Sequence, residues 1–137
     1  MTTPTSIGNK SFVKIVARLS DLGYTVSIPI GEGYAYDLVA DDGTNLYRVQ
    51  CKTARMEKNE TLVFNCYTVV AVNNGKARYI NKRYTGEIDV FAAYSPDTDQ
   101  VFIVPIEVAS GQVCRLRLSG DRYFRRGSSL LAKDFVV

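Results

Sequence analysis

The stretch that decides the fold runs Tyr36-Asp-Leu-Val-Ala-Asp-Asp-Gly-Thr-Asn-Leu-Tyr-Arg-Val-Gln-Cys-Lys52. Two runs of strand-forming residues, 36–40 and 45–52, flank the segment 41–44, and an Asp-Gly pair between such runs predicts a β-hairpin. If Asp42 and Gly43 form a two-residue turn, Asp37 lies opposite Arg48. Gln50 is then the diagonal neighbour of Asp37, and diagonal Cβ atoms lie about 7–8 Å apart.

Side chains along a strand point alternately to opposite faces. The predicted register gathers the polar side chains on one face: Asp37, Arg48, Gln50 and Lys52. It gathers the apolar side chains on the other face, which suits packing against a helix: Leu38, Val49 and Cys51. This sorting depends on the turn, because a three-residue turn would move Asp37 to the opposite face.

The polar face suits phosphodiester hydrolysis. Asp37 offers an anionic oxygen, Gln50 a neutral amide oxygen and Cys51 a main-chain carbonyl, which are the ligands that Mg²⁺ or Mn²⁺ takes. A bound Mg²⁺ polarises a phosphate oxygen and lowers the pKa of a water that can attack it. Lys52 can position that water and neutralise the developing charge. The same residue types also occur on ordinary solvent-facing strands, so the pattern alone leaves both interpretations open.

The segment Ser6–Leu22 is the only strong helix prediction. Its apolar residues recur at helical spacing: Phe12, Ile15, Val16, Leu19 and Leu22. Ser6 is the predicted N-cap, and Gly23 stands where a left-handed residue ends a helix. A strand is expected next, at residues 24–28.

The rest of the chain is predicted to be extended. Strands are expected over 61–72 and 112–118, and a second hairpin joins 88–94 to 100–104. We expect a turn at 73–75 and a basic loop at 120–129. The 137 residues are long enough for one domain with a core. We therefore expect a single α/β domain over 1–137, with the core motif in 6–52, a basic extended segment in 53–88, and further strands with the basic loop in 89–137.

Composition excludes several kinds of chemistry. The chain has no histidine, which rules out Ser-His-Asp and Cys-His catalysis and histidine-zinc hydrolysis. Its three cysteines are widely spaced and form no C-x-x-C pair, which favours reduced thiols in an intracellular protein. No apolar run is long enough to span a membrane, and no leader pattern opens the chain. A cytoplasmic location is expected.

The net charge of +3 is unevenly distributed. Residues 1–75 are neutral overall, so the whole excess lies in residues 76–137. It is concentrated in two groups of cations, at 76–83 and at 115–126. Such clusters favour a polyanionic partner, most simply nucleic acid, although an ordinary solvated surface has the same composition.

The sequence as a whole resembles PD-(D/E)-x-K nuclease domains. In that fold a helix precedes three strands, an acid begins the second strand, and (D/E)-x-K ends the third. Asp37 and the run Gln50-Cys-Lys52 stand in those places in the same order. Glutamine in place of the second acid is similar to the small homing endonucleases encoded by group I introns. Other stretches are similar to that group: Gly23–Pro29, Tyr36–Val39, Gln50–Arg55, Tyr84–Phe91, Val101–Val108 and Ala132–Phe135.

The resemblance implies a restriction-endonuclease-like core, with an N-terminal helix followed by a mixed, mainly antiparallel sheet. It implies a Mg²⁺-dependent endonuclease that cuts double-stranded DNA at a specific site, with Asp37, Gln50 and Lys52 as catalytic residues. Cutting both strands needs two copies, so a homodimer or homotetramer is expected.

The sequence departs from the family pattern in three places. Phe12 stands where the family often carries a metal-binding glutamate on the helix, and Glu32 is a candidate substitute. Tyr36 replaces the proline that usually precedes the first acid. No second helix is predicted between Thr53 and Glu87. The Phe12 departure supports a rival interpretation, a DNA-binding domain that kept the fold but lost cleavage; a protein-interaction domain is a third alternative.

The basic segment 73–83 is the predicted DNA-recognition element. Arginine and asparagine read base edges, and lysine and arginine also contact phosphates. With Arg55, which follows the catalytic strand, the predicted DNA-contacting residues are Arg55, Lys76, Arg78, Tyr79, Asn81, Lys82 and Arg83. A second basic group, Arg122, Arg125 and Arg126, suits either DNA contacts or ion pairs between subunits.

Overall fold

The computed structural model describes residues 2–73, 77–109, 111–120 and 130–137, and of residues 70–73 and 77–81 it describes the backbone alone. The predicted turn at 73–75 and the basic loop at 120–129 lie, except for their first residues, outside the described part. The elements are α1 (Pro4–Asp21), β1 (Thr25–Ser27), β2 (Leu38–Asp41), β3 (Leu46–Thr53), β4 (Arg55–Glu57), β5 (Thr61–Asn65), β6 (Tyr67–Asn73), β7 (Ala77–Arg83), β8 (Val90–Ser95), β9 (Gln100–Pro105), β10 (Val113–Arg117) and the short 3₁₀ helix η1 (Ala132–Asp134).

Helix α1 begins earlier than predicted. The prediction of Ser6 as N-cap is wrong, because Thr3 caps the helix: its hydroxyl accepts the Ser6 N–H at 3.1 Å, and the Ser6 hydroxyl accepts the Thr3 N–H at 2.9 Å. This reciprocal pair is a capping box, and Pro4 suits the first helical position because its missing N–H needs no partner there. Gly23, with a φ of 94°, follows the end of the helix as predicted.

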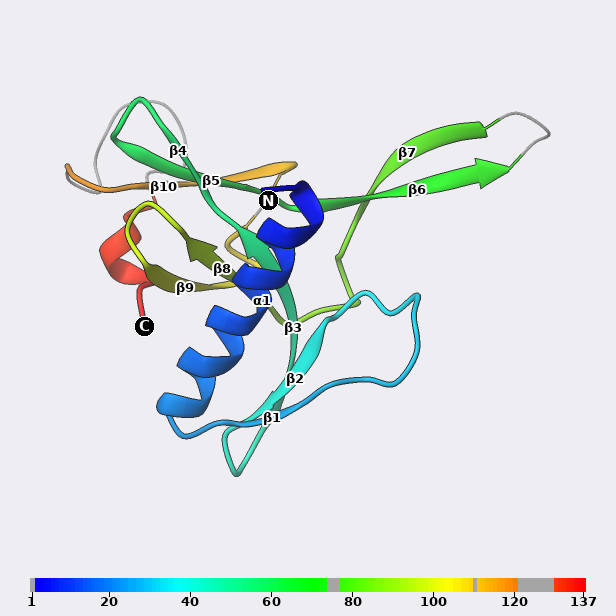
Figure 1. Ribbon diagram of the computed structural model, residues 1–137, viewed down its shortest axis with the longest axis horizontal. Coiled ribbons are helices and arrows are strands. Elements are labelled where there is room, and N and C mark those ends of the chain that lie inside the picture. The colour runs from blue at the N-terminus through cyan, green and yellow to red at the C-terminus, as the bar shows by residue number, and fades with distance from the viewer. Residues whose placement is uncertain (1, 74–76, 110, 121–129) are drawn as a thin grey trace.

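A five-stranded sheet in the order β1-β2-β3-β8-β9 forms the centre of the fold. The pair β3–β8 is parallel, and the other three pairs are antiparallel. The prediction of a mixed, mainly antiparallel sheet after an N-terminal helix is thus confirmed. The strands β10-β5-β4 form a second sheet, and β6 and β7 form a two-stranded ribbon that projects from the rest of the chain (Figure 1).

The first hairpin has a longer turn than predicted. Leu38 pairs with Val49 and Asp41 with Leu46, so a four-residue loop, 42–45, replaces the two-residue turn. The Asp42 carboxylate explains the longer loop, because it accepts the N–H groups of Thr44 and Asn45 at 2.8 and 2.6 Å.

The longer loop shifts the register by two residues. Continued by one residue, the observed pairing sets Asp37 opposite Gln50, whereas the predicted partner, Arg48, pairs with Val39. A shift of two residues leaves every side chain on its predicted face, because the faces alternate with a period of two. The predicted sorting into a polar and an apolar face therefore holds although the register was wrong.

The five-stranded sheet lies between two layers. Ile15 and Leu19 of α1 are buried against the apolar face that carries Leu38 and Val49, as predicted. Burying an aliphatic side chain of this size contributes about 1.5–3 kcal/mol. On the other face, aromatic and aliphatic side chains of β8 and β9 pack against β5 and β10: Phe91, Phe102, Phe64, Leu62 and Leu116.

All three cysteines are free thiols, and Cys66 and Cys114 are buried. Among the described residues, no helix is both long and apolar enough to cross a membrane.

Candidate active site

A cavity of about 520 Å³ lies over the polar face of β3. It brings together the three predicted catalytic residues, Asp37, Gln50 and Lys52. Other walls come from the loop before β2, from the base of the β6–β7 ribbon and from the segment before β8. Those walls contribute side chains that were not predicted as site residues: Thr68, Tyr84 and Glu87.

Asp37 lies one residue before β2 and is fixed at both its main chain and its side chain. Its N–H donates to the Val49 carbonyl oxygen at 2.8 Å, and its Oδ2 accepts the Cys51 N–H at 2.8 Å. Burial raises the pKa of Asp37 above its ordinary value, although the Cys51 N–H and the Lys52 cation act in the opposite direction. A cation at this carboxylate would restore the charged form, because opposite charge favours ionisation.

Gln50 is only 9% exposed, so the interpretation of β3 as a solvent-facing strand is wrong at this position. Its Nε2 donates a short hydrogen bond to the Ala35 carbonyl oxygen. That bond orients the amide and leaves Oε1 as the atom able to act as a ligand.

Cys51 offers only its main chain to the site. In a strand the N–H and C=O of one residue point to the same side, so its carbonyl points to the edge where Asp37 accepts its N–H. Its thiol is packed toward the α1 layer, and burial raises the pKa of that thiol, so the neutral form predominates.

Three oxygen donors of Asp37, Gln50 and Cys51 thus fit a hard divalent cation, but they carry a single negative charge. Phe12 packs against the core and also lines a second cavity, of about 380 Å³, together with Asp37 and Glu32. The helix therefore presents an aromatic ring, not a carboxylate, beside Asp37. Within the described part of the chain, no three Cys, Asp or Glu side chains group as a metal site.

The Lys52 side chain runs from β3 to the base of the ribbon. Its Nζ donates to the main-chain oxygen of Tyr67 and to the hydroxyl of Tyr84, both at 3.1 Å. These two partners hold the ammonium group at the wall of the cavity that it shares with Asp37 and Gln50.

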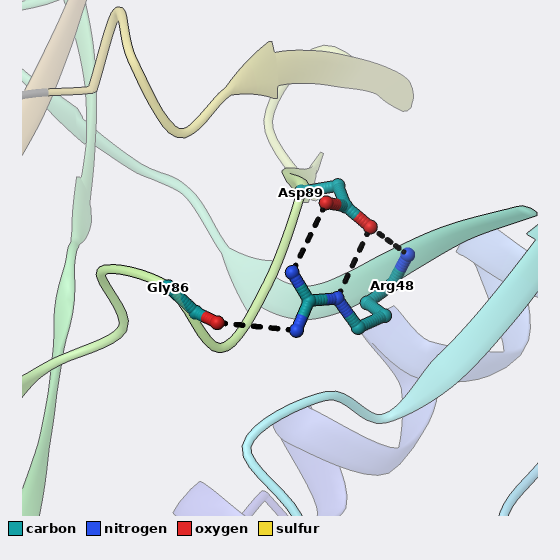
Figure 2. Close-up of polar contacts among 3 residues, drawn as sticks. All are labelled: Arg48, Gly86 and Asp89. Atoms are coloured by element: carbon teal, nitrogen blue, oxygen red, sulfur yellow. Dashed lines mark hydrogen bonds and ion pairs between the residues drawn. The ribbon is translucent and has the colours of Figure 1, made fainter.

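Arg48, the fourth residue of the polar face, binds the segment before β8 (Figure 2). Its guanidinium donates to both carboxylate oxygens of Asp89 at 3.2 Å and to the Gly86 carbonyl oxygen at 3.2 Å. The Asp89 N–H in turn donates to the Arg48 carbonyl oxygen at 2.9 Å. This pairing fixes the segment that brings Tyr84 and Glu87 to the cavity.

The rim of the cavity carries one ion pair, between Lys82 and Glu87, at 3.0 Å. No local pattern in the sequence marks Glu87 or Tyr84 as site residues. Both lie in the stretch 84–91 that resembles homing endonucleases, and that resemblance is the one signal that singled out the segment.

The structure separates the predicted DNA-contacting residues. Lys82 and Arg83 are exposed at the base of the ribbon, and Lys82 lines the cavity. Arg55 lies in β4 and lines neither cavity, and its guanidinium lies 3.9 Å from the Glu57 carboxylate.

The side chains of the other predicted DNA contacts lie outside the described part of the chain. Arg78, Tyr79 and Asn81 lie in β7, where the backbone alone is described. Lys76 and the second basic group, Arg122, Arg125 and Arg126, lie outside the described residues. The described residues between Thr53 and Glu87 form strands β4 to β7 and include no helix.

A helix packed on a mixed sheet, with a carboxylate, an amide and an ammonium group meeting at one cavity, is the architecture of restriction-endonuclease-like nucleases. The family model described as PD-(D/E)XK endonuclease matches residues 2–137, and the chain belongs to this family. PD-(D/E)XK nucleases generally use divalent metal ions.

A solved structure has the same fold. It is the structure of a bacterial homing endonuclease, I-Ssp6803I, which superposes with a TM-score of 0.73 at 21% sequence identity. The superposition covers 98% of this chain and 89% of the homing endonuclease chain. No curated protein sequence matches the chain.

Proposed function

We propose that this chain is a metal-dependent, site-specific endonuclease of the homing type that hydrolyses phosphodiester bonds in double-stranded DNA. The observation that carries the proposal is the meeting of Asp37, Gln50 and Lys52 at one cavity in a member of a nuclease family.

Asp37, the Gln50 amide oxygen and the Cys51 main-chain carbonyl would hold a Mg²⁺ ion, and Mn²⁺ suits the same ligands. When bound, the ion would stabilise charge on the phosphate and supply an activated water. The Cys51 N–H holds the Asp37 carboxylate in place, and the Ala35 carbonyl orients the Gln50 amide. Lys52 places a positive charge where the attacked phosphate gains negative charge.

The ligand set predicts weak metal binding by the free protein. Phe12 leaves Asp37 as the one carboxylate that we assign to the site, and a site with fewer charged ligands binds a hard cation more weakly. Phosphate oxygens of the substrate would complete the coordination, so metal and DNA would bind cooperatively.

The β6–β7 ribbon is the proposed DNA-recognition element, with Lys76, Arg78, Tyr79, Asn81, Lys82 and Arg83 as contacts. A projecting two-stranded ribbon fits the width of the major groove. Lys82 connects this surface to the cavity, because it belongs to both. Arg55 would contact the DNA backbone further from the scissile bond. Double-strand cutting would use a homodimer or homotetramer.

Phe12 also supports a second candidate, a DNA-binding domain of this fold without cleavage. Incubation of plasmid and branched DNA with Mg²⁺ or Mn²⁺ separates the two. Nicked or linear product that requires the metal and is lost in Lys52→Ala and Asp37→Ala supports the nuclease. Salt-sensitive DNA binding without any product supports the second candidate.

A further inference from the structure

The ammonium group of Lys52 is held by the base of the β6–β7 ribbon. Tyr67, whose main-chain oxygen accepts one hydrogen bond from Nζ, is the first residue of β6. Tyr84, whose hydroxyl accepts the other, directly follows Arg83, the last residue of β7 and the pairing partner of Tyr67. The first residue of β6 and the residue that follows β7, both at the base of the ribbon, therefore contact the Lys52 ammonium group.

Tyr84 is a rigid partner for such a bond. It is 4% exposed, and its ring packs edge-on against Phe91 with ring centres 5.6 Å apart. The Lys52 Nζ lies 4.9 Å from the centre of the Tyr84 ring but 3.1 Å from its hydroxyl oxygen, so the ammonium group contacts the hydroxyl end of the side chain.

A lysine side chain has four rotatable bonds and loses considerable entropy when it is fixed. We propose that Tyr84 is a positioning residue that fixes the Lys52 ammonium group at the cavity. This inference rests on the proposed function, in which Lys52 acts on the phosphate. With Tyr67 and Tyr84 accepting two of the three N–H groups, the third is the one available to a phosphate oxygen or water.

The bond also ties the lysine to the recognition ribbon. The Tyr67 main-chain oxygen and the Tyr84 hydroxyl both lie at the base of the ribbon, so the two bonds fix the ammonium group relative to β6 and β7.

Tyr84→Phe removes the hydroxyl and keeps the ring against Phe91. We expect kcat to fall about 10-fold, with KM within about twofold of the wild-type value, because orientation contributes to the chemical step more than to binding. The matched control is Tyr94→Phe. Tyr94 is equally buried at 4% exposure, and its hydroxyl donates to Asp99 at 2.7 Å in the cluster packed against α1. This control should cleave at the wild-type rate.

A second measurement needs neither DNA nor cleavage. NMR relaxation at the Lys52 side-chain ¹³Cε and ¹⁵Nζ in the free protein should show an ordered group in the wild type and in Tyr94→Phe, and a mobile group in Tyr84→Phe. Fluorotyrosine at position 84 keeps the ring and weakens the acceptor, which provides the same test should Tyr84→Phe not fold.

The cleavage rate and the NMR order of the Lys52 side chain distinguish the proposed function from the positioning role of Tyr84. If the wild type does not cleave but Tyr84→Phe mobilises Lys52, the proposed function fails and the positioning role stands. If Lys52 keeps its wild-type order in Tyr84→Phe, the positioning role is overturned, whatever happens to kcat.

Discussion

The guanidinium of Arg48 and the carboxylate of Asp89 form two hydrogen bonds of 3.2 Å, and the same carboxylate accepts the Arg48 main-chain N–H at 2.7 Å. The Asp89 carboxylate thus binds both the guanidinium and the main-chain N–H of Arg48 in β3. These bonds (Figure 2) hold the segment before β8 beside the proposed catalytic strand. The same segment carries Tyr84 and Glu87, which line the cavity.

Asp89→Asn tests the energetic role of this pair. Hydrogen bonds from Arg48 hold the pKa of Asp89 below its ordinary value of 3.8, so the stabilisation is present above pH 3.8 and is lost as the pH falls through the lowered pKa. We expect a loss of at most about 1 kcal/mol at pH 7, because solvent screens a pair this exposed. Thermal unfolding from pH 2 to pH 7 checks this. Asp97→Asn, at an exposed aspartate in the turn before β9, is the control and should match the wild type.

Asp37→Asn is expected to stabilise the protein while abolishing cleavage. Burial raises the pKa of Asp37, so its ionisation costs stability as the pH rises from 3.8 through the raised pKa. Asparagine keeps an oxygen for the Cys51 N–H and carries no charge to desolvate. Without metal, the variant should melt above the wild type at pH 7 and equal to it near pH 3. A lower melting temperature at pH 7 would contradict the account.

Phe12→Glu is expected to raise Mg²⁺ affinity about 10-fold by adding a second charged ligand. Calorimetry without DNA measures this, and cleavage should increase in parallel. The variant should lose about 1–3 kcal/mol of stability, since Phe12 packs against the core. Phe12→Leu controls for the lost ring and should bind Mg²⁺ as weakly as the wild type. Micromolar Mg²⁺ binding by the wild type would refute the single-carboxylate assignment.

The faces of the first hairpin followed from sequence because strand side chains alternate with a fixed period. Its register did not, because the Asp42 carboxylate accepts two main-chain N–H groups and so stabilises a longer loop. The predicted start of the helix was wrong for a similar reason. Thr3 and Ser6 both suit capping, and the reciprocal bond between them decides which one is the cap.

The other residues that line the cavity could not be predicted from local sequence patterns. Tyr84 and Glu87 join Lys52 at the cavity because β8 pairs in parallel with β3, and this pairing joins residues 41 positions apart, such as Val49 and Val90. The Arg48–Asp89 bonds span the same interval. Such contacts depend on the assembled sheet, and no periodicity in the chain indicates them.

Lys82→Ala should weaken DNA binding across all sequences and reduce the slope of log K against log salt by about 1, as expected for the loss of one phosphate contact. Fluorescence anisotropy at several salt concentrations measures the slope. Lys133→Ala, at an exposed lysine of η1, is the control and should leave it unchanged. An unchanged slope in Lys82→Ala would remove Lys82 from the DNA-binding surface.

The most direct test of the central claim is cleavage of a supercoiled plasmid library with randomised inserts, with Mg²⁺ or EDTA, by the wild type and by Lys52→Ala. Nicked or linear product is expected at selected inserts with the wild type and Mg²⁺. Lys52→Ala should give at least about 100-fold less product, and EDTA should abolish it. Cleavage by Lys52→Ala at the wild-type rate, or equal cleavage in EDTA, would contradict the central claim.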